Sequence, residues 1–262
     1  MRIITISASL VTTLLSGVLA SATTMPSDDA NLAWQRYLKT DTEIPPSFRF
    51  PHSHCFRSAS AAHKLPETLL LAVARGESDF NATARSKANA HGVMQIQWPG
   101  TAQHLGIFRL TELYDPCTNI EAGARYLNEL LQSYDGNLHL ALAAYNYGPS
   151  RIARDGSNIP PGAEWYSGYI YQHLDYVLGD RNPKKPLGEH LYSELGRTTL
   201  VSFAEPYRAA AFVDSMEQLS PGLQLDWFRH DVGRFSVVLV YADKVEFQRS
   251  AALLAHAGFR LQ

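Results

Sequence analysis

Long apolar runs and clusters of basic residues are both scarce in this sequence. After residue 19, no apolar run reaches the roughly 18 residues that a membrane-spanning helix requires. The formal net charge is −2, and no run of Lys or Arg follows the N-terminal segment. Nothing in the charge pattern therefore attracts the chain to the phosphates of nucleic acid. We expect neither a nucleic-acid partner nor a membrane span beyond the N-terminus.

The N-terminus itself has the pattern of an export signal. Met1 and Arg2 precede an apolar segment over residues 3–19, and the triplet ASA at 20–22 has the small-x-small form of a signal-peptidase site. No cysteine follows directly to accept a lipid. We therefore expect residues 1–22 to be a cleaved signal peptide and the remaining chain to be a soluble periplasmic protein.

Cysteine is scarce as well, because only Cys55 and Cys117 are present. An even count in an exported chain favours a disulfide over two free thiols. His52, His54 and His63 lie near Cys55, so a metal site is the alternative. Zinc sites of this kind usually have a second pair of ligands at comparable spacing, which the sequence lacks. The sequence favours the disulfide and predicts no metal and no cofactor.

A helix beginning at Pro66 carries the candidate chemistry. Proline suits the first turn, where its missing N–H is no loss. At helical spacing Leu70, Val73 and Glu77 share one stripe, so the carboxyl points into a core. Burial and the negative end of the helix macrodipole both favour the protonated carboxyl, which a general acid needs. On the stripe alone, a helix end whose glutamate has reached solvent is the commoner case.

Helical patterns continue after this segment. Thr118 and Glu121 form a capping-box signature that predicts a helix start. Residues 138–146 are apolar on nearly every face and predict a buried central helix. A further helical run covers residues 164–178. We predict a mainly helical domain over residues 55–180.

The C-terminal residues 197–262 change period. Strand-like segments at 198–203 and 234–241 are each followed by an acidic turn and an Ala-rich helical stretch. Each stretch ends at a glycine and a short apolar segment, which predicts two β-α-β units in a small α+β, ferredoxin-like βαββαβ domain. We expect a linker at 181–196 and a lead-in segment at 23–54.

Three motifs occur at characteristic spacings: GESDFN at 76–81, GVMQI at 92–96 and AAYNYGP at 143–149. Together they resemble those of the lysozyme-like lytic transglycosylases, over roughly residues 55–178. The resemblance implies a mainly α lysozyme-like domain. It also implies cleavage of the β-1,4 bond between N-acetylmuramic acid and N-acetylglucosamine in peptidoglycan, with a 1,6-anhydro product. It outweighs the solvent-exposed interpretation of Glu77.

The same resemblance implies roles for individual residues. Glu77 matches the catalytic acid, which protonates the glycosidic oxygen and then deprotonates the sugar's own 6-hydroxyl. No second catalytic acid is expected, because the acetamido and 6-hydroxyl groups of the substrate supply the nucleophiles. The substrate-binding positions that the resemblance implies are Ser86, Met94, Gln95, Tyr145, Asn146 and Glu164.

Other features point to a subgroup and a partner. His91 replaces the small residue usual before the motif glycine. The sequence around Cys55 and the run LYDPCTNI at 113–120 look like the variant found in transglycosylases of secretion or conjugation machines. The tail is similar in pattern to the SPOR domain, which binds glycan strands. We expect it to hold the enzyme on glycan as a separate unit that takes no part in the chemistry, with a bare structural module as the alternative.

Two further functions stay open at this point. A muramidase of the same fold would use water in place of the 6-hydroxyl. A non-catalytic peptidoglycan-binding component of a secretion system would use the cleft only for docking. An analysis of the reaction products separates these functions, because the anhydro product is lighter by one water.

Overall fold

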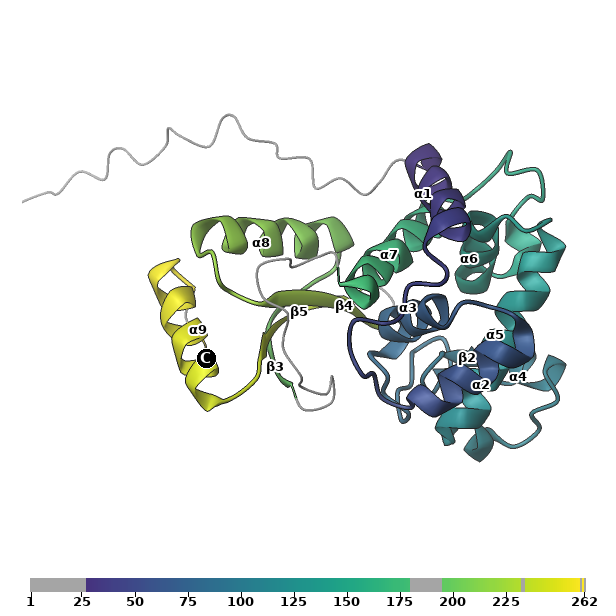
Figure 1. Ribbon diagram of the computed structural model, residues 1–262, viewed down its shortest axis with the longest axis horizontal. Helices are drawn as coiled ribbons and strands as arrows, with labels where there is room; N and C mark the ends of the chain where they lie inside the picture. Colours follow the sequence, from purple (N-terminus) through teal and green to yellow (C-terminus); the bar gives the residue numbers. More distant parts are fainter. Residues whose placement is uncertain (1–26, 180–194, 232–233, 260, 262) are drawn as a thin grey trace, which may run out of the picture.

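A computed structural model describes residues 27–179, 195–231, 234–259 and 261 of the chain (Figure 1). The predicted signal peptide lies outside these residues, as do all but the last two residues of the predicted linker. Within the described ranges, none of the helices combines the length and the apolar character needed to cross a membrane.

Helices dominate the first part of the chain, up to residue 179. In chain order they are α1 (Ser27–Thr40), α2 (Ser53–His63), α3 (Glu67–Ser78), α4 (Gly100–His104), η1 (Leu110–Tyr114), α5 (Pro116–Ser133), α6 (Leu138–Tyr147), η2 (Pro149–Arg151) and α7 (Pro161–Leu178). Two short antiparallel strands, β1 (Ala90–His91) and β2 (Ile96–Gln97), lie between α3 and α4. This arrangement confirms the prediction of a mainly helical N-terminal part.

The centre of this part is α6. Its side chains from Leu138 to Ala144 are all buried, as the apolar sequence predicts, and α5 and α7 pack against it. Asn137 caps its first turn by accepting a hydrogen bond from the Leu140 N–H at 3.1 Å. Gly148, with a φ of 86°, ends the helix. The central helix therefore places its last turn at the edge of the core.

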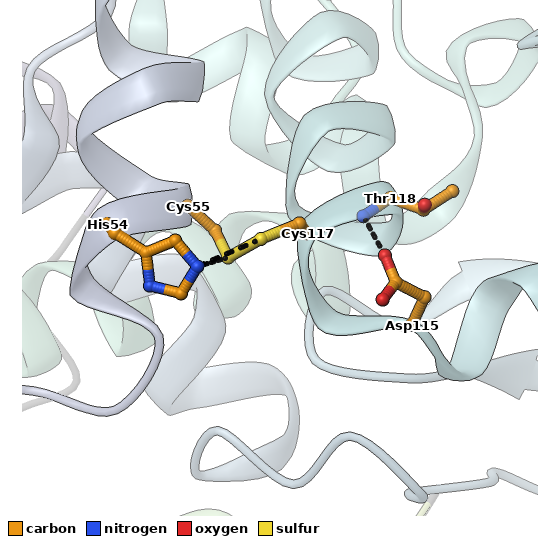
Figure 2. The surroundings of a disulfide bond; sticks show 5 residues. All are labelled: His54, Cys55, Asp115, Cys117 and Thr118. Atoms are coloured by element: carbon orange, nitrogen blue, oxygen red, sulfur yellow. Dashed lines mark hydrogen bonds between the residues drawn. A yellow bond between two sulfur atoms is a disulfide. The ribbon is translucent and has the colours of Figure 1, made fainter.

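The start of α5 differs from the prediction. Pro116 occupies its first turn, and the Asp115 side chain caps it by accepting a hydrogen bond from the Thr118 N–H at 2.8 Å (Figure 2). Thr118 therefore lies inside the helix, not at its cap. The predicted disulfide between Cys55 and Cys117 is present and joins α2 to the first turn of α5, with the two Cα atoms 5.0 Å apart.

The remaining elements form a C-terminal unit, which we define as residues 195–261. They are β3 (Gly196–Phe203), α8 (Pro206–Leu219), β4 (Leu225–Asp231), β5 (Arg234–Tyr241) and α9 (Lys244–His256). The strand order is β3-β5-β4, and β5 is antiparallel to both neighbours. The outer strands β3 and β4 are consequently parallel and are connected through α8, which is a split β-α-β arrangement.

Two expectations for this unit need correction. The fourth strand expected after α9 is not seen in the residues described there. The Phe259 N–H closes the end of α9 by donating to the Leu254 carbonyl at 2.8 Å, and Arg260 lies outside the described residues. The described order is therefore βαββα, not βαββαβ. The outer strand β4 is also longer than the short apolar segment expected after the first Ala-rich helical stretch.

The two parts of the chain share one continuous buried core. Strand β4 packs against α3, and its aromatic residues contact α7 (Figure 1). Leu195 is buried, and Gly196 already belongs to β3, so the last two residues of the expected linker are part of the folded structure. The unit that we expected to stand apart from Glu77 instead covers the end of the Glu77 helix.

Candidate active site

Glu77 lies in the last turn of α3 with only 3% of its side chain exposed. Every residue of this helix from Thr68 to Glu77 is buried. The prediction that the carboxyl points into the core is therefore confirmed, and the solvent-exposed interpretation is wrong. The carboxyl is placed there by the helical stripe that begins at Leu70.

Each carboxyl oxygen of Glu77 has a donor. The Tyr166 hydroxyl, from α7, donates a hydrogen bond to Oε1. The Arg229 guanidinium, from β4, donates to Oε2 at 2.8 Å and forms an ion pair with it. Burial, followed by the charge of Glu77, raises the pKa of Tyr166 well above its usual value. Tyr166 therefore keeps its proton and remains a hydrogen-bond donor to the carboxyl.

Arg229 is held in this position by its backbone as well as its side chain. Its N–H donates to the Tyr169 hydroxyl at 2.9 Å, and that hydroxyl donates to the Gly76 carbonyl at 2.9 Å. Burial by itself lowers the pKa of Arg229, but the charge of Glu77, the nearby Tyr166 and Tyr169 hydroxyls and the hydrogen bond to Glu77 together outweigh it, and the pKa is raised overall. The Arg229 guanidinium is thus a fixed cation at the Glu77 carboxyl.

A loop over residues 91–95 forms the wall beside Glu77. The Ser78 hydroxyl donates to the Val93 carbonyl at 2.7 Å, and the Tyr145 hydroxyl donates to the Met94 carbonyl at 2.8 Å. Burial, and then the charge of Glu77, raise the pKa of Tyr145 well above its usual value. The loop therefore connects the end of α3 to the end of α6, where the motif tyrosine lies.

Asn119, in α5, holds the same loop from beneath. Its Oδ1 accepts the Met94 N–H at 2.7 Å, and its Nδ2 donates to the carbonyls of His91 and Leu113 at 2.9 Å each. A Cβ at Gly92, where φ is 78°, would lie 2.3 Å from Asn119 Nδ2. The loop therefore requires a glycine at this position.

His91 begins the loop and is fully buried. Its Nδ1 lies 2.9 Å from the Tyr114 hydroxyl and its Nε2 lies 2.9 Å from Asn89 Oδ1. Burial, with a smaller contribution from the charge of Arg85, lowers the pKa of His91. The His91 imidazole is therefore neutral, and it packs beside the loop.

The remaining predicted binding residues occupy different positions. The Met94 side chain is fully buried and packs under Gly123. Gln95 donates its amide to the Gly92 carbonyl at 2.9 Å, and the Ser86 hydroxyl accepts the Ala90 N–H at 3.1 Å. These three side chains shape the wall from within. Half-buried positions are taken by Asn146, in the last turn of α6, and Glu164, in the first turn of α7.

The sequence reasoning did not single out Tyr166, Asn119 or Arg229. Tyr166 lies three residues before Tyr169 on the same apolar helix face, so the spacing could have suggested it. Asn119 follows the α5 cap on the buried face and was read only as part of a motif. Nothing near Arg229 in the sequence connects it to Glu77, which is 152 positions away.

The alternative metal site would use His54 together with Cys55 and Cys117. His54 Nε2 lies 3.3 Å from Cys55 Sγ and 3.4 Å from Cys117 Sγ (Figure 2). These three residues are close enough together to suggest a metal site. The two sulfurs are bonded to each other, so neither is a thiolate that could bind a metal.

The helical part of the chain is similar to known transglycosylases. Residues 54–165 match the family described as Transglycosylase SLT domain. The resemblance read from the three motifs is thereby confirmed for these residues.

Individual relatives are similar over the same part. A soluble lytic murein transglycosylase of Escherichia coli K12 is 36% identical over 113 residues, which is 40% of this chain and 17% of that protein. A transglycosylase of Enterobacteria phage PRD1 is 33% identical over 126 residues, or 48% of this chain and 44% of that protein. The crystal structure of the 70 kDa soluble lytic transglycosylase of Escherichia coli aligns with a TM-score of 0.44 and 27% identity, over 59% of this chain and 28% of that one. The chain thus spans less than half of each relative.

Proposed function

We propose that this protein is a peptidoglycan lytic transglycosylase in which Glu77 is the general acid and base. The observation that best supports this proposal is the buried carboxyl of Glu77, at the end of α3, within the residues that match the SLT family. Tyr166 fixes one of its oxygens, and Tyr145 lies close enough for the Glu77 charge to raise its pKa. One oriented carboxyl is what this reaction requires.

The reaction balances without water. The protonated Glu77 carboxyl gives its proton to the glycosidic oxygen as the bond from C1 of N-acetylmuramic acid breaks. The 6-hydroxyl oxygen of the same sugar then bonds to C1, and its proton passes to the Glu77 carboxylate. The carboxyl is regenerated, and the new chain end carries a 1,6-anhydro ring. Two-carboxylate glycosidases need their second group to attack the sugar or to activate water, a task that the substrate performs here.

Substrate contacts fall on the wall beside Glu77. We assign Tyr145 and Asn146, at the end of α6, to the sugar on one side of the bond, and Glu164, on α7, to saccharide farther away. Ser86, Met94 and Gln95 keep the wall in shape through the contacts described above. The substrate is the glycan strand of peptidoglycan, so the site of action is the periplasm.

The test is a product analysis with two matched variants. Purified sacculi are digested with the wild type, with Glu77→Gln and with Glu67→Gln, and the muropeptides are weighed by mass spectrometry. We expect 1,6-anhydro ends from the wild type and from Glu67→Gln, whose carboxyl lies at the opposite end of α3. We expect none from Glu77→Gln, because an amide cannot give a proton, and general acid catalysis is worth ~10²–10⁴-fold.

The same analysis decides between the open alternatives. Products heavier by one water would identify a muramidase. A binding component would be identified if the wild type and Arg229→Gln both bound sacculi and neither released any product.

The proposed glycan anchor in the C-terminal unit stays a prediction, as does a secretion or conjugation machine as partner. Sedimentation with sacculi tests the anchor. The Glu77→Gln chain is compared with the same variant ending at residue 180. Equal sedimentation of the two, with both folded by circular dichroism, would contradict the anchor.

A further inference from the structure

Three alternate positions at the end of α3 are ion-paired with the C-terminal unit. Arg75 pairs with Asp226 of β4. Glu77 pairs with Arg229 of the same strand at 2.8 Å. The third pair joins Asp79, which caps α3, to Arg197 of β3 at 3.3 Å. The signs are complementary at every position, so the unit fits the end of this helix in one register.

Apolar contacts lie behind the ion pairs. Phe228 stacks on His173 of α7 with ring centroids 5.8 Å apart and an angle of 11° between the ring planes. Trp227 lies 5.4 Å from Tyr169, measured between ring centroids. The Arg75 guanidinium lies 5.0 Å from the centre of the Phe228 ring. The unit is therefore seated on α3 and α7 through a packed surface, not through isolated surface charges.

This seating is incompatible with the chemistry proposed for Glu77. A general acid must come within roughly 2.6–3.2 Å of the oxygen that it protonates. The Arg229 guanidinium already lies 2.8 Å from Oε2 of Glu77, and the Tyr166 hydroxyl is hydrogen-bonded to Oε1. The arginine also pairs with the carboxylate, the form that has no proton to give. A glycosidic oxygen cannot reach the carboxyl until β4 moves.

We propose that the C-terminal unit is an autoinhibitory element, and that Arg229 is the residue by which it blocks the Glu77 site. The proposal rests on the proposed function of Glu77 as the catalytic acid. Activation is the displacement of β4 from the end of α3, which exposes the carboxyl to glycan and frees it to bind a proton. An activating ligand must bind this open form more tightly than the closed one.

The test uses the full-length chain and a charge-neutral double variant. Asp226→Ala/Arg229→Ala removes one acidic and one basic group of β4, and with them the ion pairs to Arg75 and Glu77. Asp214→Ala/Arg249→Ala is the matched control, because it removes the same two residue types from exposed positions on α8 and α9. Cleavage of soluble, peptide-free glycan strands is measured for each chain. Binding of chitopentaose, a β-1,4 oligomer of N-acetylglucosamine, is measured by calorimetry.

We expect the β4 variant to cleave at least about tenfold faster than the wild type and to bind chitopentaose at least about tenfold more tightly. Removing one partner of such a charge pair destabilises the closed form, relative to the open form, by more than the free energy of a tenfold change. The control should match the wild type in both measurements. If the β4 variant does not fold, as judged by its near-ultraviolet circular dichroism, Arg229→Gln is used with the same expectations.

Each other outcome has a definite reading. Equal rates and equal affinities in all chains would overturn autoinhibition and leave the proposed function standing. A loss of both rate and affinity in the β4 variant would also overturn it, because Arg229 would then serve the substrate. Tighter binding without cleavage by any chain would support the blocked site and refute the lytic reaction.

Discussion

The Tyr166 hydroxyl in α7 donates its hydrogen bond to Glu77 Oε1 in α3. Both side chains are buried, so the bond is shielded from water. It ties the Glu77 carboxyl to a helix that lies outside all three sequence motifs. The orientation of Glu77 therefore depends on a residue that belongs to neither the motif loop nor α6.

Replacing Tyr166 with Phe should lower turnover by about 10- to 100-fold, because a hydrogen bond to a charged group contributes roughly 1.5–3 kcal/mol. The binding of glycan oligomers should change little, since the ring is kept. Tyr134→Phe is the control, because that hydroxyl donates to the carbonyls of Pro149 and Ile152. Initial rates on soluble glycan strands measure the effect. Turnover by Tyr166→Phe equal to that of the control would show that Glu77 needs no such support.

The loop beside Glu77 rests on a glycine in α5. A Cβ at Gly123 would lie 2.6 Å from Met94 Cβ, so Gly123→Ala must displace the loop. We expect a loss of about 1–3 kcal/mol in the free energy of unfolding, and lower activity with it. Gly168→Ala is the control, because nothing lies within 4 Å of a Cβ there. Thermal unfolding of both variants is the measurement. An unchanged melting temperature for Gly123→Ala would refute this account of the packing.

The disulfide closes a loop of 62 residues between Cys55 and Cys117. In the chain-entropy model a loop of this size contributes about 4 kcal/mol to stability. The double variant Cys55→Ser/Cys117→Ser should therefore unfold at markedly lower denaturant concentration than the oxidised wild type. Titration of the denatured, unreduced protein checks the bond itself. Two reactive thiols in that titration would contradict it.

His91 should make stability depend on pH. Its pKa is lowered from the ordinary value of 6.5 in the folded protein, mainly by burial. As the pH falls through this value, the unfolded chain binds a proton that the folded protein resists. The free energy of unfolding therefore decreases in acid and is unaffected above neutral pH.

Urea unfolding at about pH 7.5 and about pH 5.5 measures this dependence. His91→Gln should lose less stability on acidification than the wild type, although it is less stable throughout. His256→Gln, an exposed change in α9, should behave as the wild type does. If His91→Gln and the wild type lose equal stability on acidification, His91 is not the responsible group.

Sequence periodicity was sufficient where one apolar face decides the local structure. The stripe that includes Leu70 and Val73 directs Glu77 toward the core, although the stripe alone favoured a solvent-exposed glutamate and the three motifs were needed to outweigh it. The apolar run at 138–146 predicted the central helix α6. Strand β5, with the run FSVVLVY, was predicted with its observed limits. In each case, the element buries its apolar face whatever its tertiary partner is.

Strand β4 was not predicted in full because two of its inward positions carry charge, Asp226, which is buried, and Arg229, which is half-buried. Asp226 and Arg229 interrupt the apolar pattern that marks a strand, so the segment reads as a loop. Those two side chains are neutralised by Arg75 and Glu77, which precede them by about 150 positions in the chain. Periodicity describes only local sequence, so it cannot show that a charge will find a partner at such a distance. The contact between Arg229 and Glu77 is of this kind.

The boundary of the family match has a consequence for how this domain can be transplanted. The match ends at residue 165, whereas α7 runs from Pro161 to Leu178. The unmatched turns hold Tyr166, and they also hold the buried side chains of Ile170 and Leu174, on the helix that packs against α3. A recombination event that respected only the family boundary would produce a chain with the motifs and without a supported carboxyl. A transferable domain with a supported Glu77 must therefore extend beyond residue 165, to the end of α7.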